Sequence, residues 1–336
     1  MTLSKMLIFT TIALLCAIAL VVVFKDKKKG KKEQRLAPVE VHLEQRPVLV
    51  AAHNSEKLTA SHNPEKPKEI HENKTGIQPT TAIVELETNA DRIRELFNTD
   101  GPKLPIVETI TYKSRVDWQK GRPAWLSDYA RHYQTSRHFI ARSLNGNPEY
   151  FKQEIAEGDS FNVLRKDQNI QFHLLVDLST CKMRLYYDLP DNKERVLLKT
   201  YSVGLGRMDE SKASGFLTPF GKYTLGNKIA IYKPKMMGYH NGDQIEMIGT
   251  FGTRWIPFDK EVGECSAPAK GLGIHGLPWT ATSAGEKVQD RSSIGKYQSD
   301  GCIRLASEDM EELFAIIITK PTTIELVNAQ MAQNKK

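Results

Sequence analysis

Residues 299–305 read Ser-Asp-Gly-Cys-Ile-Arg-Leu, and residues 274–276 read Ile-His-Gly. A cysteine at neutral pH is mostly protonated, so a working nucleophile needs a base or a positive field beside it. We expect His275 to supply the base for Cys302. Gly301 allows a tight turn that directs backbone amides at one point. An isolated cysteine or histidine is usually a packing residue, but the glycines around both favour acyl transfer through a thioester.

The residues around this pair predict a mainly β domain. Period-two alternation and aromatic content predict short strands at 172–177, 182–187, 196–203, 223–225, 229–232 and 323–327. Gly204-Leu205-Gly206 lacks the third glycine of a dinucleotide site, so we interpret it as a turn. A helix capped near Ser307 is expected to point Met310, Leu313, Phe314 and Ile317 inward.

Four short motifs follow one another in this region: Thr218-Pro219-x-Gly221, Ile274-His275-Gly276, Ser293-Ile294-Gly295 and Ser299-x-Gly301-Cys302-Ile303-Arg304. In this order they resemble the motifs of L,D-transpeptidases with a YkuD-type catalytic domain, over about residues 171–328. The resemblance implies a mainly β fold with added helices. Its β-sandwich-like catalytic domain would follow a small helical or α+β module.

The resemblance also implies a reaction on peptidoglycan stem peptides, and so a role in cell-wall organisation and cell shape. Cys302 would attack the carbonyl of the L-centre at the third stem residue and release D-Ala. The thioester would then pass to an amine of another stem, with His275 as general acid and base. Backbone N–H groups at Asp300, Gly301 and Gly276 would hold the oxyanion. Acylation of Cys302 by carbapenems is a further implication.

Three more residues are candidates for substrate binding. The planar fork of Arg304 suits a substrate carboxylate, or alternatively orients the Cys302 loop. Ser299 and His240 are expected to line the cleft, although His240 also suits a plain loop position. The cysteines Cys16, Cys181, Cys265 and Cys302 have no metal-ligand spacing, so we expect no metal or cofactor. Cys181 and Cys265 are either a disulfide or, as we slightly prefer, two free thiols.

Two features depart from the family pattern. Asp300 occupies a position where many members have a second histidine, and an acid there would disfavour the thiolate. The segment 277–291 after His275 is longer than the usual connection. We interpret it as a loop over the site that influences the choice of acyl acceptor.

Residues 7–24 carry no charge and are long enough to cross a bilayer core as a helix. We expect a single-pass anchor in the bacterial cytoplasmic membrane, following a short flank at 1–6. A cleaved signal peptide and lipidation of Cys16 are alternatives. Residues 25–35 hold seven basic and two acidic side chains, which under the positive-inside rule would keep the catalytic domain in the cytoplasm. The chemistry instead requires it outside, in the periplasm.

The basic cluster belongs to this membrane flank. The rest of the chain is close to neutral and has no nucleic-acid footprint. Residues 25–81 read as a basic flank and disordered tether. Residues 82–168 read as a small module, with a helix at 83–97 and another beginning at Pro123. Residues 138–163 partly resemble a glycan-binding LysM repeat without its opening strand; the alternative is a structural helical module that braces the catalytic domain. The catalytic domain would span 169–328 and a tail 329–336.

Two other functions stay open from the sequence. If water rather than an amine attacks the acyl-enzyme, the protein acts as an L,D-carboxypeptidase. A non-catalytic peptidoglycan-binding anchor is the third possibility, although a pure binder has no use for a nucleophile.

Overall fold

The computed structural model describes residues 90–150, 154–283 and 285–328. The expected anchor, basic flank, tether and tail lie outside these residues, as do residues 83–89 of the helix expected at 83–97. In the described part of that segment only Arg94–Phe97 is helical, so the predicted helix is shorter there than expected. Within the described part of the chain, no helix is both long and apolar enough to span a membrane.

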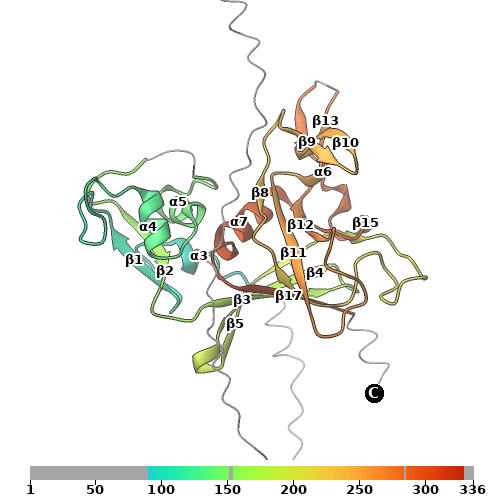
Figure 1. Ribbon diagram of the computed structural model, residues 1–336, viewed down its shortest axis with the longest axis horizontal. Coiled ribbons are helices and arrows are strands. Elements are labelled where there is room, and N and C mark those ends of the chain that lie inside the picture. Colours follow the sequence, from blue (N-terminus) through green and yellow to red (C-terminus); the bar gives the residue numbers. More distant parts are fainter. Residues whose placement is uncertain (1–89, 151–153, 284, 329–336) are drawn as a thin grey trace, which may run out of the picture. The chain divides into compact units, whose positions relative to one another are not determined.

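One large sheet organises the C-terminal part of the chain (Figure 1). Its strand order is β16-β12-β11-β7-β17-β3-β4-β5, and β8 pairs with β11. The strands are β3 (Gln171–Asp177), β4 (Lys182–Leu189), β5 (Glu194–Ser202), β7 (Gly221–Leu225), β8 (Ala230–Ile231), β11 (Arg254–Val262), β12 (Gly273–Gly276), β16 (Ile303–Leu305) and β17 (Thr322–Val327). Every strand predicted from the sequence is present, with ends that differ by at most two residues. The mainly β fold is therefore confirmed.

The two ends of this strand order meet. Gly204, just after β5, exchanges two backbone hydrogen bonds with Arg304 of β16, at 2.8 and 2.9 Å. The next two residues form β6 (Leu205–Gly206), which runs parallel to β15 (Tyr297–Ser299). The prediction of a turn at 204–206 was therefore wrong. Glycine is needed here for close approach, because a Cβ on Gly204 would lie 2.6 Å from the carbonyl oxygen of Ser293.

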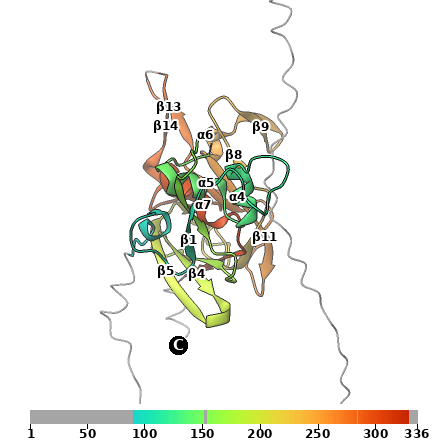
Figure 2. The same ribbon diagram turned by 90° about the vertical axis from the view of Figure 1, so that its left-hand side faces the viewer.

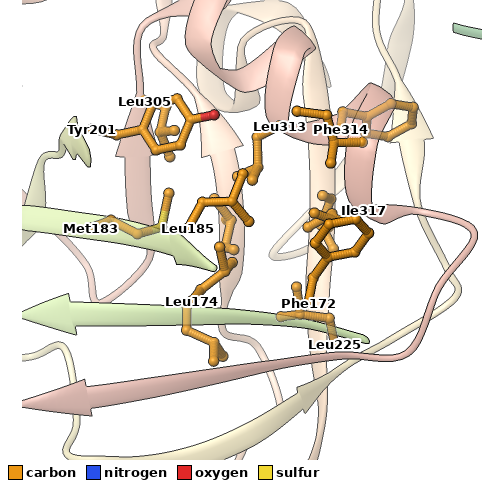
Figure 3. Close-up of a cluster of buried hydrophobic side chains, with 14 of the residues drawn as sticks. Phe172, Leu174, Met183, Leu185, Tyr201, Leu225, Leu305, Leu313, Phe314 and Ile317 are labelled. Atoms are coloured by element: carbon orange, nitrogen blue, oxygen red, sulfur yellow. The ribbon is translucent and has the colours of Figure 1, made fainter. Parts of the chain in front are cut away.

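Helix α7 (Ser307–Ile317) covers the core of the sheet (Figure 3). The four residues predicted to face inward, Met310, Leu313, Phe314 and Ile317, are buried. The predicted cap is different, because Ala306 holds the N-cap position and makes no side-chain cap. The backbone N–H of Ser307 donates instead to Oε1 of Gln289 at 2.9 Å. This end of the helix is thus capped by a neighbouring segment.

The residues before the large sheet form a strand–helix–helix–strand unit, drawn in green and cyan in Figure 1. It consists of β1 (Val107–Thr111), α4 (Leu126–His132), α5 (Arg137–Asn145) and β2 (Ser160–Leu164), with β1 and β2 antiparallel. A short helix, α3 (Arg94–Phe97), precedes it. The sequence analysis missed β1, which supplies the opening strand that its partial LysM likeness lacked.

This unit shares a hydrophobic core with the large sheet. Leu96, Leu104, Ile106 and Phe139 belong to the same buried cluster as the side chains of β3 and β4. A smaller cluster of its own lies around Tyr129. The boundary near residue 168 therefore separates two stretches of chain that are packed into one hydrophobic core.

Helix α4 begins later than predicted. Trp125 is its N-cap and is extended, so the helix starts at Leu126 rather than at Pro123. The carboxylate of Asp128 accepts from the backbone N–H of Trp125 at 2.9 Å and from the guanidinium of Arg122 at 2.6 Å. These bonds hold the preceding residues in an extended conformation.

Two hairpins and a short helix lie together beyond β11 and β12, as both views show (Figures 1 and 2). They are β9 (Met237–His240) with β10 (Asp243–Glu246), α6 (Ile248–Phe251), and β13 (Trp279–Ala281) with β14 (Lys287–Gln289). The segment 277–291, predicted as a loop, thus contains a hairpin. An ion pair between Lys287 and Glu246 joins the two hairpins.

Candidate active site

Pairing of two parallel strands brings the segments that carry His275 and Cys302 side by side. His275 of β12 is in register with Arg304 of β16, and Cys302 directly precedes β16. Residues paired in register point to the same side of a sheet, so the side chains of His275 and Arg304 project together. Cys302 lies beside Gly273, whose backbone N–H lowers the pKa of its thiol.

Cys302 is half-buried and predominantly protonated at neutral pH. Burial raises the pKa of its thiol to about 11, against weaker lowering by the Gly273 amide and the charge of Arg304. The thiol also donates to the carbonyl oxygen of Gly271 across 3.7 Å. A thiol in this state needs a base at the moment of attack.

His275 is placed and protonated as such a base requires. Its Nδ1 lies 2.7 Å from the carbonyl oxygen of Gly276. A carbonyl only accepts hydrogen bonds, so in the neutral ring Nδ1 carries the proton and Nε2 carries the lone pair. Backbone hydrogen bonds with Gly276 and Phe251 both raise the pKa of the ring, against the larger effect of burial. Only 3% of the side chain is exposed. Burial lowers the pKa of His275 to about 4, so the imidazole is neutral at pH 7.

Two aromatic rings pack against His275, and a third packs on one of them. The ring of Phe251 contacts His275 edge-on at 5.4 Å between centroids, and the ring of Trp255 lies 5.9 Å away. His240 contacts the other side of Phe251 edge-on at 5.0 Å. The candidate His240 is therefore one ring away from the base.

The loop that presents Cys302 is locked by two hydroxyl groups. Gly301 has a φ of +119°, and a Cβ there would lie 3.0 Å from the carbonyl oxygen of Leu217. The buried hydroxyl of Thr218 donates to the Gly301 carbonyl at 3.0 Å. Ser299 donates to the carbonyl of Cys302 at 2.6 Å and accepts from the Gly301 N–H at 3.2 Å. The loop conformation is thus fixed from both sides.

The sequence of the large-sheet region matches a known catalytic domain. Residues 171–326 match the family model for YkuD, the L,D-transpeptidase catalytic domain. These residues are a YkuD-type L,D-transpeptidase catalytic domain. The expectation from the four sequence motifs is therefore confirmed for this part of the chain.

Single proteins and structures that resemble this chain are between 14% and 26% identical to it where they align. A Bacillus licheniformis protein named as the L,D-transpeptidase YkuD is 26% identical over 194 residues, which cover 57% of this chain and 87% of the relative. The crystal structure of the helical cell shape determining protein Pgp2 from Campylobacter jejuni is 18% identical, with a TM-score of 0.30 and coverage of 48% of each chain. That of Mycobacterium tuberculosis L,D-transpeptidase 1 is 14% identical, with a TM-score of 0.25, and covers 50% of this chain and 70% of its own. This chain thus spans about half the length of Pgp2.

Three residues predicted for the site make contacts within the protein. Ser299 is 2% exposed, and its hydroxyl bonds within the loop that carries Cys302. The N–H of Gly301, an expected oxyanion donor, is bonded to the hydroxyl of Ser299. The carbonyl of Gly276 orients His275, and this bond leaves the predicted role of the Gly276 N–H unaffected.

Arg304 is half-buried and lies two residues after Cys302. Its Nε is buried without a hydrogen-bond partner among the described residues. Burial lowers the pKa of Arg304, and the nearby Cys302, Asp300 and Asp290 act in the opposite direction. An arginine with unused donors beside the nucleophile is suited to holding an anion.

Asp300, the departure from the family pattern, is largely exposed and paired with Arg207 at 2.6 Å. It ranks last among the influences on the pKa of Cys302, so its effect on the thiol is small. Its side chain is directed to a cation that the sequence analysis did not identify.

Sequence reasoning also missed Gly273 and Phe251 and left Thr218 without a role. Thr218 belongs to a recognised motif, but its partner Gly301 is 83 residues away. The described cysteines Cys181, Cys265 and Cys302 are free, so the preferred prediction of unpaired thiols is confirmed. The described residues contain no group of three or more His, Cys, Asp or Glu that suits a metal ion.

Proposed function

We propose that this protein is a cysteine L,D-transpeptidase that cross-links peptidoglycan stem peptides. The supporting observation is the pairing of β12 with β16, which brings His275 beside the strand that Cys302 directly precedes, with the Nδ1 proton of His275 held by the Gly276 carbonyl. The neutral imidazole takes the thiol proton as sulfur attacks the L-centre carbonyl of the third stem residue. The amide C–N bond then breaks, and the same proton leaves with the amine of D-Ala.

The second half of the reaction uses the same residues in reverse. The amine of another stem attacks the thioester, His275 takes its proton, and the sulfur of Cys302 leaves and is reprotonated. Backbone N–H groups of the 300–302 loop that are not bonded to Ser299 would hold the oxyanion. Arg304 would hold a substrate carboxylate through its unused donors.

Attachment to the membrane is part of the proposal. The uncharged segment 7–24 would anchor the protein, and residues 25–81 would tether the domain on the extracytoplasmic side, where the stem peptides are. The basic residues at 25–35 argue for the opposite orientation. Protease treatment of intact cells tests this point, since a fully protected catalytic domain would contradict it.

The products formed from tetrapeptide-stem muropeptides test the reaction. We expect mass spectrometry to detect cross-linked dimers with the full-length protein and none with the Cys302→Ala variant. Trimmed tripeptides alone would identify an L,D-carboxypeptidase. Unchanged muropeptides together with Cys302-independent retention on cell-wall material would identify a binding protein. When the protein is incubated with a carbapenem instead of muropeptides, we expect mass spectrometry to detect a covalent adduct on Cys302.

A further inference from the structure

The Arg207–Asp300 pair lies at the edge of the Cys302 loop, and its position is fixed by the backbone. The N–H of Arg207 donates to the carbonyl of Ser299 at 2.9 Å, and its carbonyl accepts from Leu217 at 2.9 Å. The preceding residue, Gly206, fits against the loop so closely that a Cβ there would lie 3.0 Å from the Cα of Gly301. Arg207 is therefore held beside the residues that present the nucleophile.

The side chains of the pair are open to solvent. The Nη2 of Arg207 donates to one carboxylate oxygen of Asp300 at 2.6 Å, with 61% and 82% of the two side chains exposed. Exposed pairs of this kind add little to stability, so a competing anion displaces such a carboxylate at small cost. The guanidinium of Arg207 is thus available to a ligand.

A second cation is close by. Arg207 is among the charges that lower the pKa of Arg304, so the two guanidinium groups lie within electrostatic range of each other. The buried Nε of Arg304 has no partner among the described residues, whereas Arg207 is balanced by Asp300. Two cations near the loop that carries Cys302 suit a substrate that carries two carboxylates near its scissile bond.

We propose that Arg207 is a specificity-determining residue that binds the side-chain carboxylate of the third stem residue, after that carboxylate displaces Asp300. Arg304 binds the other carboxylate of the acyl donor. This inference rests on the proposed transpeptidase function and adds the substrate class: donor stems with a free acid, rather than an amide, on the third residue. Asp300 acts as a placeholder that keeps weaker anions away from Arg207.

The test compares two tetrapeptide donors that differ only in amidation of the third-residue side-chain carboxylate. We expect the Arg207→Gln variant of the full-length protein to lose about tenfold in kcat/KM on the acid donor, mainly through KM, because one charged hydrogen bond is lost. On the amidated donor the change should stay within about twofold. The preference for acid over amide therefore falls about tenfold.

Two further variants sharpen the test. Asp300→Asn removes the competing carboxylate and should lower KM for the acid donor. Arg195→Gln is the matched control, because Arg195 is an exposed arginine paired with Asp188 on β4. It should leave the acid-to-amide preference unchanged.

The outcomes separate this inference from the function on which it rests. Equal losses on both donors in Arg207→Gln would indicate a structural role and overturn the assignment. An unchanged preference in that variant would overturn it as well. If the wild-type protein acts on neither donor, the proposed function itself is contradicted.

Discussion

The hydroxyl of Thr218 connects two glycines that frame the nucleophile loop. It donates to the carbonyl of Gly301 at 3.0 Å and accepts from the N–H of Gly206 at 2.7 Å. Thr218 is completely buried, so neither backbone group has water as a substitute. The Thr-Pro motif, 84 residues before Cys302, thus sets the shape of the loop that presents the cysteine.

Replacing Thr218 with valine tests this link. The isosteric change leaves a buried N–H and a buried carbonyl unpaired, so we expect the free energy of unfolding to fall by about 1–3 kcal/mol. Activity should fall more than tenfold because the loop is no longer fixed. Thr218→Ser keeps the hydroxyl and should retain most of the unfolding free energy and most of the activity. Urea denaturation and turnover measure the two effects, and equal behaviour of valine and serine variants would contradict the assignment.

The reactivity of Cys302 should rise with pH over an unusually wide range. Burial raises the pKa of its thiol to about 11, and only the thiolate reacts with iodoacetamide. The rate of alkylation at Cys302, followed by peptide mass spectrometry, should therefore increase about tenfold per pH unit up to about pH 11. A plateau below pH 8 would mean that the resting site holds a thiolate instead.

Acid should destabilise the protein through a histidine outside the site. His138 of α5 is buried against Phe314, and its Nδ1 accepts from the backbone N–H of Tyr150 at 3.1 Å. Burial lowers its pKa to about 3, with a smaller contribution from the charge of Arg254 and weaker ones from Arg137, Arg142 and Lys233. The unfolded chain therefore binds the proton first as pH falls from 6.5 to 3.

The folded state thus loses stability across that window, by on the order of 5 kcal/mol at most, and regains it as pH rises. His138→Asn keeps an acceptor for Tyr150 but does not titrate. We expect this variant to show a shallower loss of unfolding free energy between pH 6.5 and 3 than the wild type. Identical pH dependence in both proteins would rule out His138 as the source.

A buried ion pair joins the N-terminal unit to the catalytic sheet. Arg254 of β11 is 2% exposed, and its Nη2 lies 3.3 Å from the carboxylate of Glu149. Arg254 also directly precedes Trp255, which packs on His275.

Removing one partner leaves a buried charge unpaired, so Glu149→Gln should reduce the unfolding free energy by about 3–5 kcal/mol. The control Asp188→Asn breaks an exposed pair with Arg195 and should cost less than about 1 kcal/mol. Chemical denaturation compares the two variants. Equal small losses would show that the N-terminal unit does not depend on this pair.

Local patterns predicted the strands well and long-range contacts poorly. Strand β4 shows its alternation in Met183, Leu185 and Tyr187, and the structure buries all three. The five-residue strand β1 was missed, although its β-branched Val, Thr and Ile residues were a usable signal. Gly204 and Gly206 resembled a turn because close backbone approach and turn formation select the same residue.

The sequence pointed to the two residues at the centre of the candidate site but not to the residues that surround and position them. The motifs around Cys302 and His275 singled out the two residues of the proposed reactive pair, since such glycine-framed residues carry local information. The roles of Thr218, Phe251 and Arg207 depend on which distant segments the sheet brings together. Nothing in the sequence next to Arg207 indicates that it faces Asp300, 93 positions later.

Intact-protein mass spectrometry of a single turnover tests the central claim most directly. The full-length protein is mixed with a tetrapeptide stem and quenched in acid, and free D-Ala is measured in parallel. We predict a covalent adduct on Cys302 equal in mass to the stem without D-Ala, with D-Ala released in equal amount, and neither product with Cys302→Ala. Release of D-Ala by the Cys302→Ala variant at the wild-type rate would contradict the account.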